Sequence, residues 1–432
     1  MNPSRADSLL LSAILQFIVI VASARAAGSL FRLFGQPRIC GEIAAGLLLG
    51  PSFFGLFYPH LYQSVFNPAV APQVSLLSEV GLIFVMLLIG LDFNFSHLRG
   101  GGQTALSISA AGIVVPFGLG QLLAPWVYSW MNLHVDALGF ALFMSTAMSI
   151  TAIPVLGRIM IEFNIHRTRI GALTITASAM DDACGWLLLA AVSAAVRSQL
   201  QPLRLTISLG ATVIYLLIML YGVRPLLRRW VRWVMAESGG ELSLNAFAQI
   251  LVFVFASAAV TSMIGIFPIF GAFVMGGVLF DQAEFRKALG QRLRDFVEVF
   301  FLPIFFTFTG LRTDIGSLHS RMNWLACGIV IFAATAGKFG ACTLAARFRG
   351  FSWHEASAMG IMMNTRGLME LIVLNTGYDL GIIPRPVFSM LVIMSIATTY
   401  MTAPILRCLI PRTEMKADYE ASRFVREFML PS

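Results

Sequence analysis

The chain has 432 residues, of which 57% are hydrophobic and only 12% are charged. A soluble domain usually carries about 25% charged residues, so this much apolar surface cannot be hidden from water in a soluble fold. The composition excludes a cytosolic enzyme, a nucleic-acid-binding protein and a disordered scaffold. It indicates an all-α polytopic membrane protein. In such a protein the formal net charge of +8 mainly indicates which loops lie on the cytoplasmic side of the membrane.

About thirteen apolar segments are close to the ~20 residues that a membrane-spanning helix needs. The first one resembles a cleavable signal peptide, but arginines follow it at once, and we therefore expect an uncleaved helix. The junction at residues 264–266 is the least distinct boundary. The segments lie near residues 8–34, 38–57, 74–92, 104–130, 136–161, 169–197, 203–222, 244–264, 266–282, 295–312, 322–346, 354–378 and 384–410.

Basic residues are distributed unequally between the predicted loops. If the N-terminus is outside, most of the 30 Lys and Arg residues fall in loops on the cytoplasmic side, as the positive-inside rule predicts. The longest of these loops, about Tyr221–Ser243, is predicted to be an arginine-rich turn, and residues 411–432 a short cytoplasmic tail. We expect a bacterial inner-membrane protein with its N-terminus outside and its C-terminus in the cytoplasm.

Cysteine and histidine residues give no sign of a bound cofactor. The five cysteines are scattered through apolar segments without a CxxC motif, which is typical of small core residues. The six histidines fall in or near predicted loops. No disulfide, zinc site or cofactor is expected.

The segments can be divided into six helices, a linker helix and six further helices that run through the membrane in the inverted order. The fifth helix of each half is interrupted, in the first half at Pro154, which removes a backbone donor. In the second half the interruption lies at Asn364, Thr365 and Gly367. Matched interruptions in inverted halves indicate a transport site at the middle of the bilayer, because broken backbone is tolerated there only beside a cavity. The alternative for Pro154 is an ordinary helix kink.

A pair of adjacent acids, Asp181 and Asp182, lies in the middle of an apolar segment, where a charge costs at least ~2.5–3.5 kcal/mol. Asp182, the Ser178 hydroxyl four residues earlier and backbone carbonyls near Thr151 would form an oxygen cage that suits a small hard cation. Two neighbouring acids cannot both ionise cheaply, so a bound cation or a proton is expected beside them. The alternative is a structural pair that caps a neighbouring helix.

Lys338 is the natural counter-charge, since a buried lysine without a partner loses its proton readily. An Asp–Lys ion pair would act as a switch that opens when a cation reaches the acids. The alternative for Lys338 is extension of its side chain to the membrane surface.

Four further ionisable residues are predicted to have supporting roles. Arg366 and Glu370 lie four residues apart and are expected to neutralise each other and hold the second interrupted helix. Glu42 lies near a helix start, where the helix dipole favours an anion. Glu79, near the start of its helix, is expected to bond to core backbone.

Five ordered motifs resemble the monovalent cation:proton antiporter family of Kef and CHX type. The first is Gln-Pro-Arg-Ile-Cys-Gly-Glu-Ile-Ala-Ala-Gly-Leu-Leu-Leu-Gly-Pro from Gln36, followed by Leu-Ile-Gly-Leu-Asp from Leu88. The others are Thr-Ala-Ile-Pro-Val-Leu-Gly-Arg from Thr151, the Asp181–Asp182 pair, and Asn-Thr-Arg-Gly-Leu-Met-Glu-Leu-Ile-Val-Leu-Asn from Asn364. The resemblance extends over about residues 10–410.

The resemblance implies the NhaA-type fold, with a scaffold that forms a homodimer and a core that moves like an elevator. The scaffold would comprise residues 8–92 and 244–312, the core residues 104–197 and 322–410, and the linker helix residues 203–222. The first interrupted helix would cross the second at the site. The Kef-type nucleotide-binding domain is not expected.

The resemblance also implies roles for individual residues. Asp182 would bind the cation and the proton, Asp181 would pair with Lys338, and Thr151 and Ser178 would help to hold the ion. Many relatives carry Asn or Gln in place of Asp181, and an acidic pair with this lysine goes with electrogenic exchange in similar proteins.

We therefore predict a secondary active transporter, not an enzyme, that exchanges Na⁺ or K⁺ for protons and serves pH homeostasis. Its partners would be these ions, the lipid bilayer and a second copy of the chain, without nucleic acid. Two alternatives remain at this point: a sodium-coupled symporter of an organic anion, and a cation channel or non-transporting ion sensor.

Overall fold

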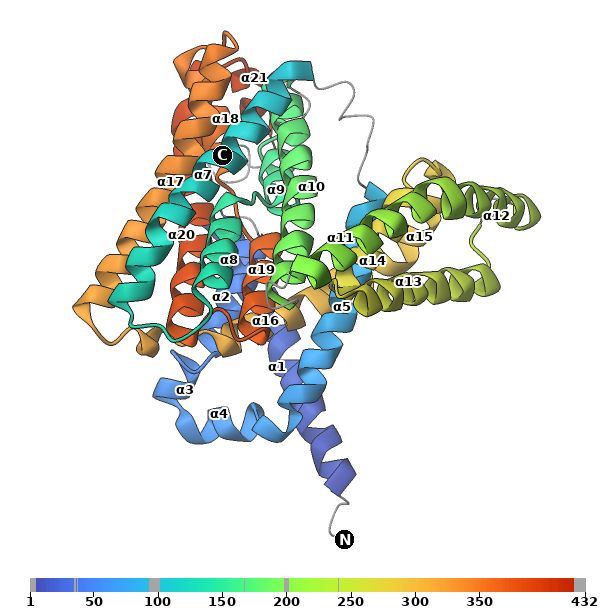
Figure 1. The fold of residues 1–432 in the computed structure, drawn as a ribbon, viewed down its shortest axis with the longest axis horizontal. Helices are drawn as coiled ribbons and strands as arrows, with labels where there is room; N and C mark the ends of the chain where they lie inside the picture. Colours follow the sequence, from blue (N-terminus) through green and yellow to red (C-terminus); the bar gives the residue numbers. More distant parts are fainter. Residues whose placement is uncertain are drawn as a thin grey trace. The chain divides into compact units, whose positions relative to one another are not determined.

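A computed structural model describes residues 5–34, 36, 38–92, 102–166, 168–197, 202–239 and 241–422. Within these ranges the secondary structure is helical, with no strand (Figure 1). Ten of the described helices are long and apolar enough to cross a membrane, against the thirteen segments expected. The difference lies in the two interrupted helices, which are in pieces, and in the short helix α14 (Pro268–Val278).

The chain divides into two compact units. Unit 1 comprises residues 1–21, 64–96 and 190–308, and unit 2 comprises residues 22–63, 97–189 and 309–432. The expected core ranges fall in unit 2 up to Leu189 and from residue 322 onward. The expected scaffold ranges are divided between the units, and a movement of core against scaffold stays a prediction.

Unit 1 contains the linker region and the helices around α14. Its junction at residues 264–266 is as expected: α13 ends at Ile264, Gly265 adopts a φ of +95°, and Pro268 begins α14. Besides the N-terminal part of α1 (Arg5–Leu33), its helices are the end of α4 (Pro59–Val65), the 3-10 turn Pro68–Val70, α5 (Ala71–Asp92), the end of α10 (Arg169–Arg197) from Ala190, α11 (Pro202–Leu217), the π-helical turn Ile218–Val223, α12 (Arg224–Glu237), α13 (Leu244–Ile264), α14, α15 (Ala283–Phe296), the π-helical turn Val297–Phe301 and most of α16 (Leu302–Arg312).

The prediction of an arginine-rich turn in this region is wrong, because Arg224–Glu237 form the helix α12. Its buried residues Leu227, Val231 and Val234 recur at helical spacing, so α12 is amphipathic. An assessment by hydropathy alone overlooks such a helix, since its polar face lowers the average.

Unit 2 holds both interrupted helices. Several of its helices begin at a side-chain cap, such as the Ser352–Glu355 capping box at the start of α18, which satisfies free amide groups. The helices are the rest of α1, α2 (Arg38–Leu49), α3 (Phe54–Phe57), the start of α4 (Pro59–Val65), α7 (Gly102–Trp130), α8 (Ala137–Ser149), α9 (Ile153–Glu162), α10 (Arg169–Arg197) up to Leu189, α17 (Arg321–Phe348), α18 (Trp353–Met363), α19 (Leu368–Asp379), α20 (Arg385–Leu409) and α21 (Lys416–Glu420). Residues 423–432 of the predicted tail lie outside the described residues.

The same glycine contacts occur in both units. In unit 2 a Cβ on Gly310 of α16 would collide with the backbone carbonyl group of Gly46 in α2. In unit 1 a Cβ on Gly276 of α14 would collide with the Leu87 carbonyl oxygen in α5. The absence of a side chain therefore permits backbone-to-backbone packing in both places. The inverted repeat itself stays a prediction.

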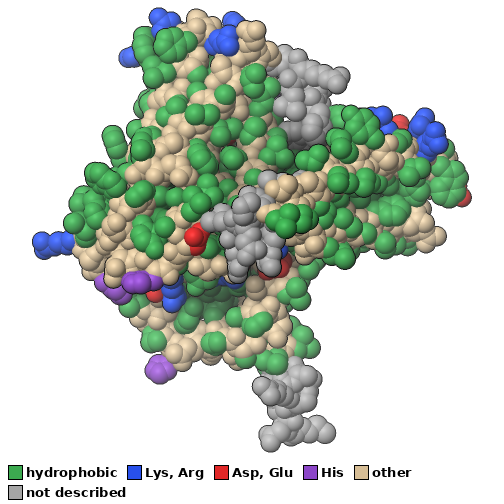
Figure 2. Space-filling model, viewed as in Figure 1, with side chains coloured by type: hydrophobic (Ala, Val, Ile, Leu, Met, Phe, Trp, Pro, Cys, Tyr) green, Lys and Arg blue, Asp and Glu red, His purple; other side chains and the backbone are tan. Residues whose placement is uncertain are grey.

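Large apolar side chains remain exposed on many helices, including Val114 at 68% and Phe332 at 73%. Figure 2 shows hydrophobic side chains spread over much of the visible face, with Lys and Arg side chains at a few places. Such surfaces are rare on soluble monomers and are expected of helices that contact lipid.

Candidate functional site

The site begins at the two interruptions that the sequence predicts, and both are present. Helix α8 ends at Ser149 and α9 begins at Ile153, with Pro154 in its first turn; the Pro154 side chain lies outside the described residues. Helix α18 ends at Met363 and α19 begins at Leu368, after Gly367 with a φ of +151° that favours glycine.

The two interruptions are bonded to each other. The Thr151 hydroxyl donates to the Met363 carbonyl at 2.8 Å, and the Ala152 amide donates to the Thr365 carbonyl at 3.0 Å. Each non-helical segment therefore satisfies backbone groups that the other leaves free, which is how broken backbone is stabilised away from water.

Two buried cations cap the free carbonyl end of α8. Arg366 donates from Nη1 to the Ala147 carbonyl and from Nη2 to the Met148 carbonyl, both at 2.5 Å. Lys338 Nζ donates to the Ser149 carbonyl. The last turn of a helix carries a partial negative charge, so positive groups there are stabilising.

Lys338 also pairs with the first of the two adjacent acids. Its Nζ lies 2.6 Å from Asp181 Oδ2, and both side chains are completely buried. The predicted Asp181–Lys338 pair is therefore present in the structure. It is not a surface lysine, so the alternative of a side chain that reaches the membrane surface is excluded.

Asp182 and Ser178 lie on the same helix, α10, and are buried at 2% and 0% exposure. The Ser178 hydroxyl and Asp182 Oδ1 have no hydrogen-bond partner among the described residues. Burying such oxygens without partners costs roughly 1–3 kcal/mol each. Since these are the ligand types that a hard cation prefers, a bound cation or proton would offset that cost.

Arg366 and Glu370 are both buried, and the Arg366 Nη1 to Glu370 Oε2 distance is 3.6 Å. This ion pair is looser than the two carbonyl bonds of the same guanidinium. The expected mutual neutralisation is therefore only part of the role of Arg366, whose closest contacts are with α8. The Ser395 hydroxyl of α20 is a further polar neighbour of Glu370.

The other predicted support residues lie in different surroundings. Thr365 donates its hydroxyl to the Met362 carbonyl, and both polar atoms of the buried Asn364 side chain lack a partner among the described residues. Glu42 is buried on α2 of unit 2. Glu79 is exposed on α5 of unit 1.

Two hydrogen-bond partners of the site were not identified from the sequence. These are the Ser149 carbonyl, which accepts from Lys338, and Thr399, which bonds to the backbone of the second interruption. The Thr399 hydroxyl accepts from the Arg366 amide at 2.9 Å and donates to the Arg366 carbonyl at 2.8 Å. The only available signal for Ser149 is its position just before the interruption, where a helix end must leave free carbonyls.

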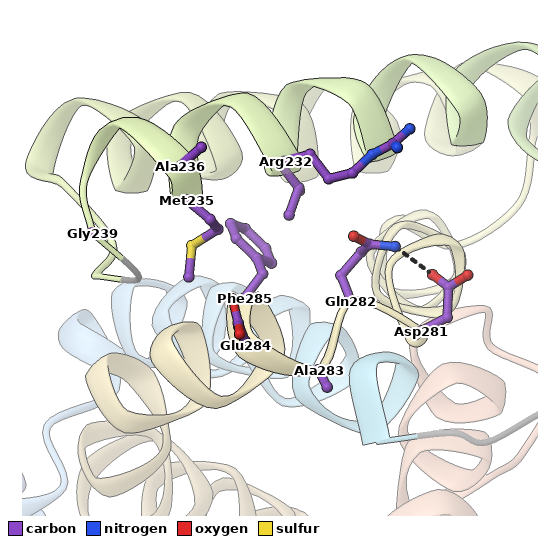
Figure 3. Close-up of a pocket in the computed structure, with 10 residues that line it drawn as sticks. Arg232, Met235, Ala236, Gly239, Asp281, Gln282, Ala283, Glu284 and Phe285 are labelled. Carbon is purple, nitrogen blue, oxygen red and sulfur yellow. Dashed lines mark hydrogen bonds between the residues drawn. The ribbon is translucent and has the colours of Figure 1, made fainter.

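A separate pocket of about 610 Å³ lies in unit 1 between α12 and the start of α15. Figure 3 shows Arg232 on one side of it and the Gln282–Asp281 hydrogen bond on the other. None of the predicted site residues lines this pocket, which accordingly has no part in the proposed ion site.

Known proteins resemble this chain over most of its length. The family described as transmembrane sodium/hydrogen exchanger matches residues 18–408. The chain is 39% identical over 401 residues to the Na(+)/H(+) antiporter NhaS4 of Synechocystis sp., covering 92% of this chain and 97% of NhaS4. It is 34% identical to cation/H(+) antiporter 17 of Arabidopsis thaliana, over 96% of this chain and 50% of that protein.

A third relative is K(+)/H(+) antiporter 1 of Saccharomyces cerevisiae, 32% identical over 88% of this chain and 44% of that protein. The chain thus spans about half the length of these two eukaryotic relatives. The solved structure of the sodium/proton antiporter MjNhaP1 from Methanocaldococcus jannaschii has the same fold, with a TM-score of 0.61 at 14% identity over 98% of this chain and all of that one. The chain therefore belongs to the sodium/hydrogen exchanger family.

Proposed function

We propose that this protein is a secondary active transporter that exchanges a monovalent cation, Na⁺ or K⁺, for protons. The observation that carries this proposal is the buried Asp181–Lys338 pair on the free carbonyl end of α8, with Asp182 next along α10. The relatives are named for Na⁺ exchange and for K⁺ exchange, which supports the substrate class and leaves both ions as candidates.

In the proposed cycle, Asp182 holds the cation and the proton in turn. The cation would be bound by Asp182, by the Ser178 hydroxyl and by oxygens near Thr151. The positive charge of the bound cation would partly neutralise the two acids. The attraction between Asp181 and Lys338 would therefore become weaker. Lys338 would leave Asp181 and lose its proton, and re-protonation on the opposite face would expel the cation.

The coupling of this exchange to movement is also a proposal. The core would shift like an elevator against a scaffold that forms a homodimer in a bacterial inner membrane. Two protons per cation would move one net charge in each cycle. The rate would then respond to membrane voltage, since 100 mV acts on one charge with about 2.3 kcal/mol.

The test uses purified protein in liposomes that contain an internal pH dye. We expect external Na⁺ or K⁺ to dissipate an imposed proton gradient, and Asp182→Asn to abolish this response, because an amide cannot exchange a cation for a proton. The exposed carboxylate variant Asp295→Asn serves as the matched control and should be unaffected.

Antiport by Asp182→Asn at the normal rate would overturn the proposal. Solute-dependent Na⁺ uptake without a pH change would indicate the symporter, and single-channel conductance or ion binding without turnover would indicate the channel or sensor. A rate that is insensitive to clamped voltage would contradict the two-proton stoichiometry and leave one-for-one exchange.

A further inference from the structure

The helix α7 packs against both helices that hold the switch, α8 with Ser149 and α17 with Lys338 (Figure 1). Its buried residues follow a helical stripe made mostly of small side chains, namely Ala105, Ile108, Ser109, Gly112, Pro116, Gly120, Ala124 and Val127. Such residues allow helices to approach closely inside a membrane. The ammonium group of Lys338 is therefore bordered by α7 as well as by its bonded partners.

Gly112 of α7 borders the end of the Lys338 side chain. A Cβ on Gly112 would lie 3.8 Å from Lys338 Cε and 3.9 Å from Nζ, and only 2.7 Å from Cys342 Sγ. Cys342 lies one helical turn after Lys338 and is completely buried. Its thiol donates to the Ile108 carbonyl of α7 at 3.6 Å, so it is held against the backbone that Gly112 exposes.

Glycine inside a helix is destabilising by roughly 0.5–1 kcal/mol relative to alanine, so its presence here calls for a spatial reason. Gly118, further along the same helix, provides the contrast, because a Cβ added to it would have no neighbouring atom within 4 Å. The two glycines therefore differ in their surroundings. Gly112 lies against the thiol of Cys342 and near the ammonium of Lys338, whereas Gly118 has no such neighbour.

We infer that Gly112 is a positioning residue for Lys338: the missing side chain leaves room for the Cys342 thiol, so that α17 packs closely on α7 and the ammonium is held between Asp181 and the Ser149 carbonyl. The inference rests on the proposed exchange function. A methyl group on Gly112 would collide with Cys342 Sγ, one helical turn after Lys338, and would shift the ammonium relative to Asp181 and distort the cation site.

The first test compares antiport kinetics of Gly112→Ala and Gly118→Ala in the liposome assay. For Gly112→Ala we expect the KM for the cation to rise roughly threefold to tenfold with kcat changed less than twofold, in the range of couplings between contacting residues. Gly118→Ala should leave both constants unchanged. Gly112→Ala/Cys342→Ala should restore the KM, because removal of Sγ gives back the space.

A second measurement does not depend on transport. Thermal unfolding of Gly112→Ala, Lys338→Met and their double variant forms a double-mutant cycle, in which we expect the two substitutions to be non-additive. An unchanged KM in Gly112→Ala, no rescue by Cys342→Ala, or additive effects in the cycle would overturn the inference. Absence of antiport in the unsubstituted protein would instead contradict the proposed function, and the thermal cycle would still decide whether Gly112 and Lys338 are coupled.

Discussion

The side chain of Arg366 illustrates how a single buried residue can hold an interrupted helix. Its guanidinium donates to two consecutive carbonyls of α8, at Ala147 and Met148, while its backbone lies in the interruption before α19. The planar fork of arginine matches two neighbouring acceptors, whereas a lysine ammonium acts as a single point charge. Arg366 therefore joins the two interruptions through geometry as well as charge.

We predict that Arg366→Lys lowers the free energy of unfolding by about 1.5–3 kcal/mol, the usual value of one hydrogen bond from a charged group. The measurement is the thermal unfolding midpoint in detergent. Arg349→Lys in the same unit is the control, because Arg349 is exposed and bonds to Ser107 Oγ and Gln103 Oε1. Equal unfolding midpoints for the two variants would contradict the assigned role of Arg366.

Sequence reasoning found the charged residues of the site and missed most of their partners. Asp181 and Lys338 could be paired because two opposite charges at membrane depth need each other. The bonds of Arg366 and Lys338 to α8 are main-chain contacts between residues 189 to 219 positions apart. Every residue carries a carbonyl, so no side-chain pattern distinguishes the carbonyls that a distant cation will reach.

Among the helices, the close contact of α16 with α2 is the clearest case of packing that requires glycine. The Cβ of an alanine at Gly310 would collide with the backbone of Gly46, and backbone cannot turn away as a side chain can. Overpacking of this kind is destabilising by about 1–3 kcal/mol. The contact of α14 with α5 in unit 1 has the same character.

Gly310→Ala is accordingly expected to lower the free energy of unfolding by about 3 kcal/mol and to reduce the yield of folded protein. Gly328→Ala on α17 has open space around it and should be neutral or slightly stabilising, because alanine favours the helix. Size-exclusion profiles and thermal unfolding of the two variants provide the comparison. A Gly310→Ala protein as stable as the original would show that α16 and α2 do not approach this closely.

The elements themselves were largely predictable, because apolar length fixes most membrane helices and Pro154 and Gly367 mark the interruptions. The exception is α12, because an amphipathic helix has a low mean hydropathy and is overlooked when only the average is considered. Its arginines face one way and Leu227, Val231 and Val234 the other, so its mean hydropathy resembles that of a loop. The helical spacing of those three apolar residues was the signal that could have identified it.

For the whole molecule, the distribution of basic residues predicts which ends of the helices face the cytoplasm. The arginines of α12 should lie inside and the segment between α16 and α17 outside, because basic loops are retained on the cytoplasmic side during insertion. Glu241, four residues after the end of α12, and His319, between α16 and α17, are both exposed. A cysteine at each position, in a chain with the five native cysteines replaced, reports the side directly.

In intact cells we expect a membrane-impermeant maleimide to label His319→Cys and not Glu241→Cys, with both labelled once the membrane is opened by detergent. Labelling after detergent is the control, since it demonstrates that each cysteine is reactive. The reverse pattern in intact cells would place α12 outside and invert the predicted topology. The proton and the cation use the same buried site. An inverted topology would therefore reverse the membrane faces from which each of them reaches Asp182, and the contacts within the site would stay the same.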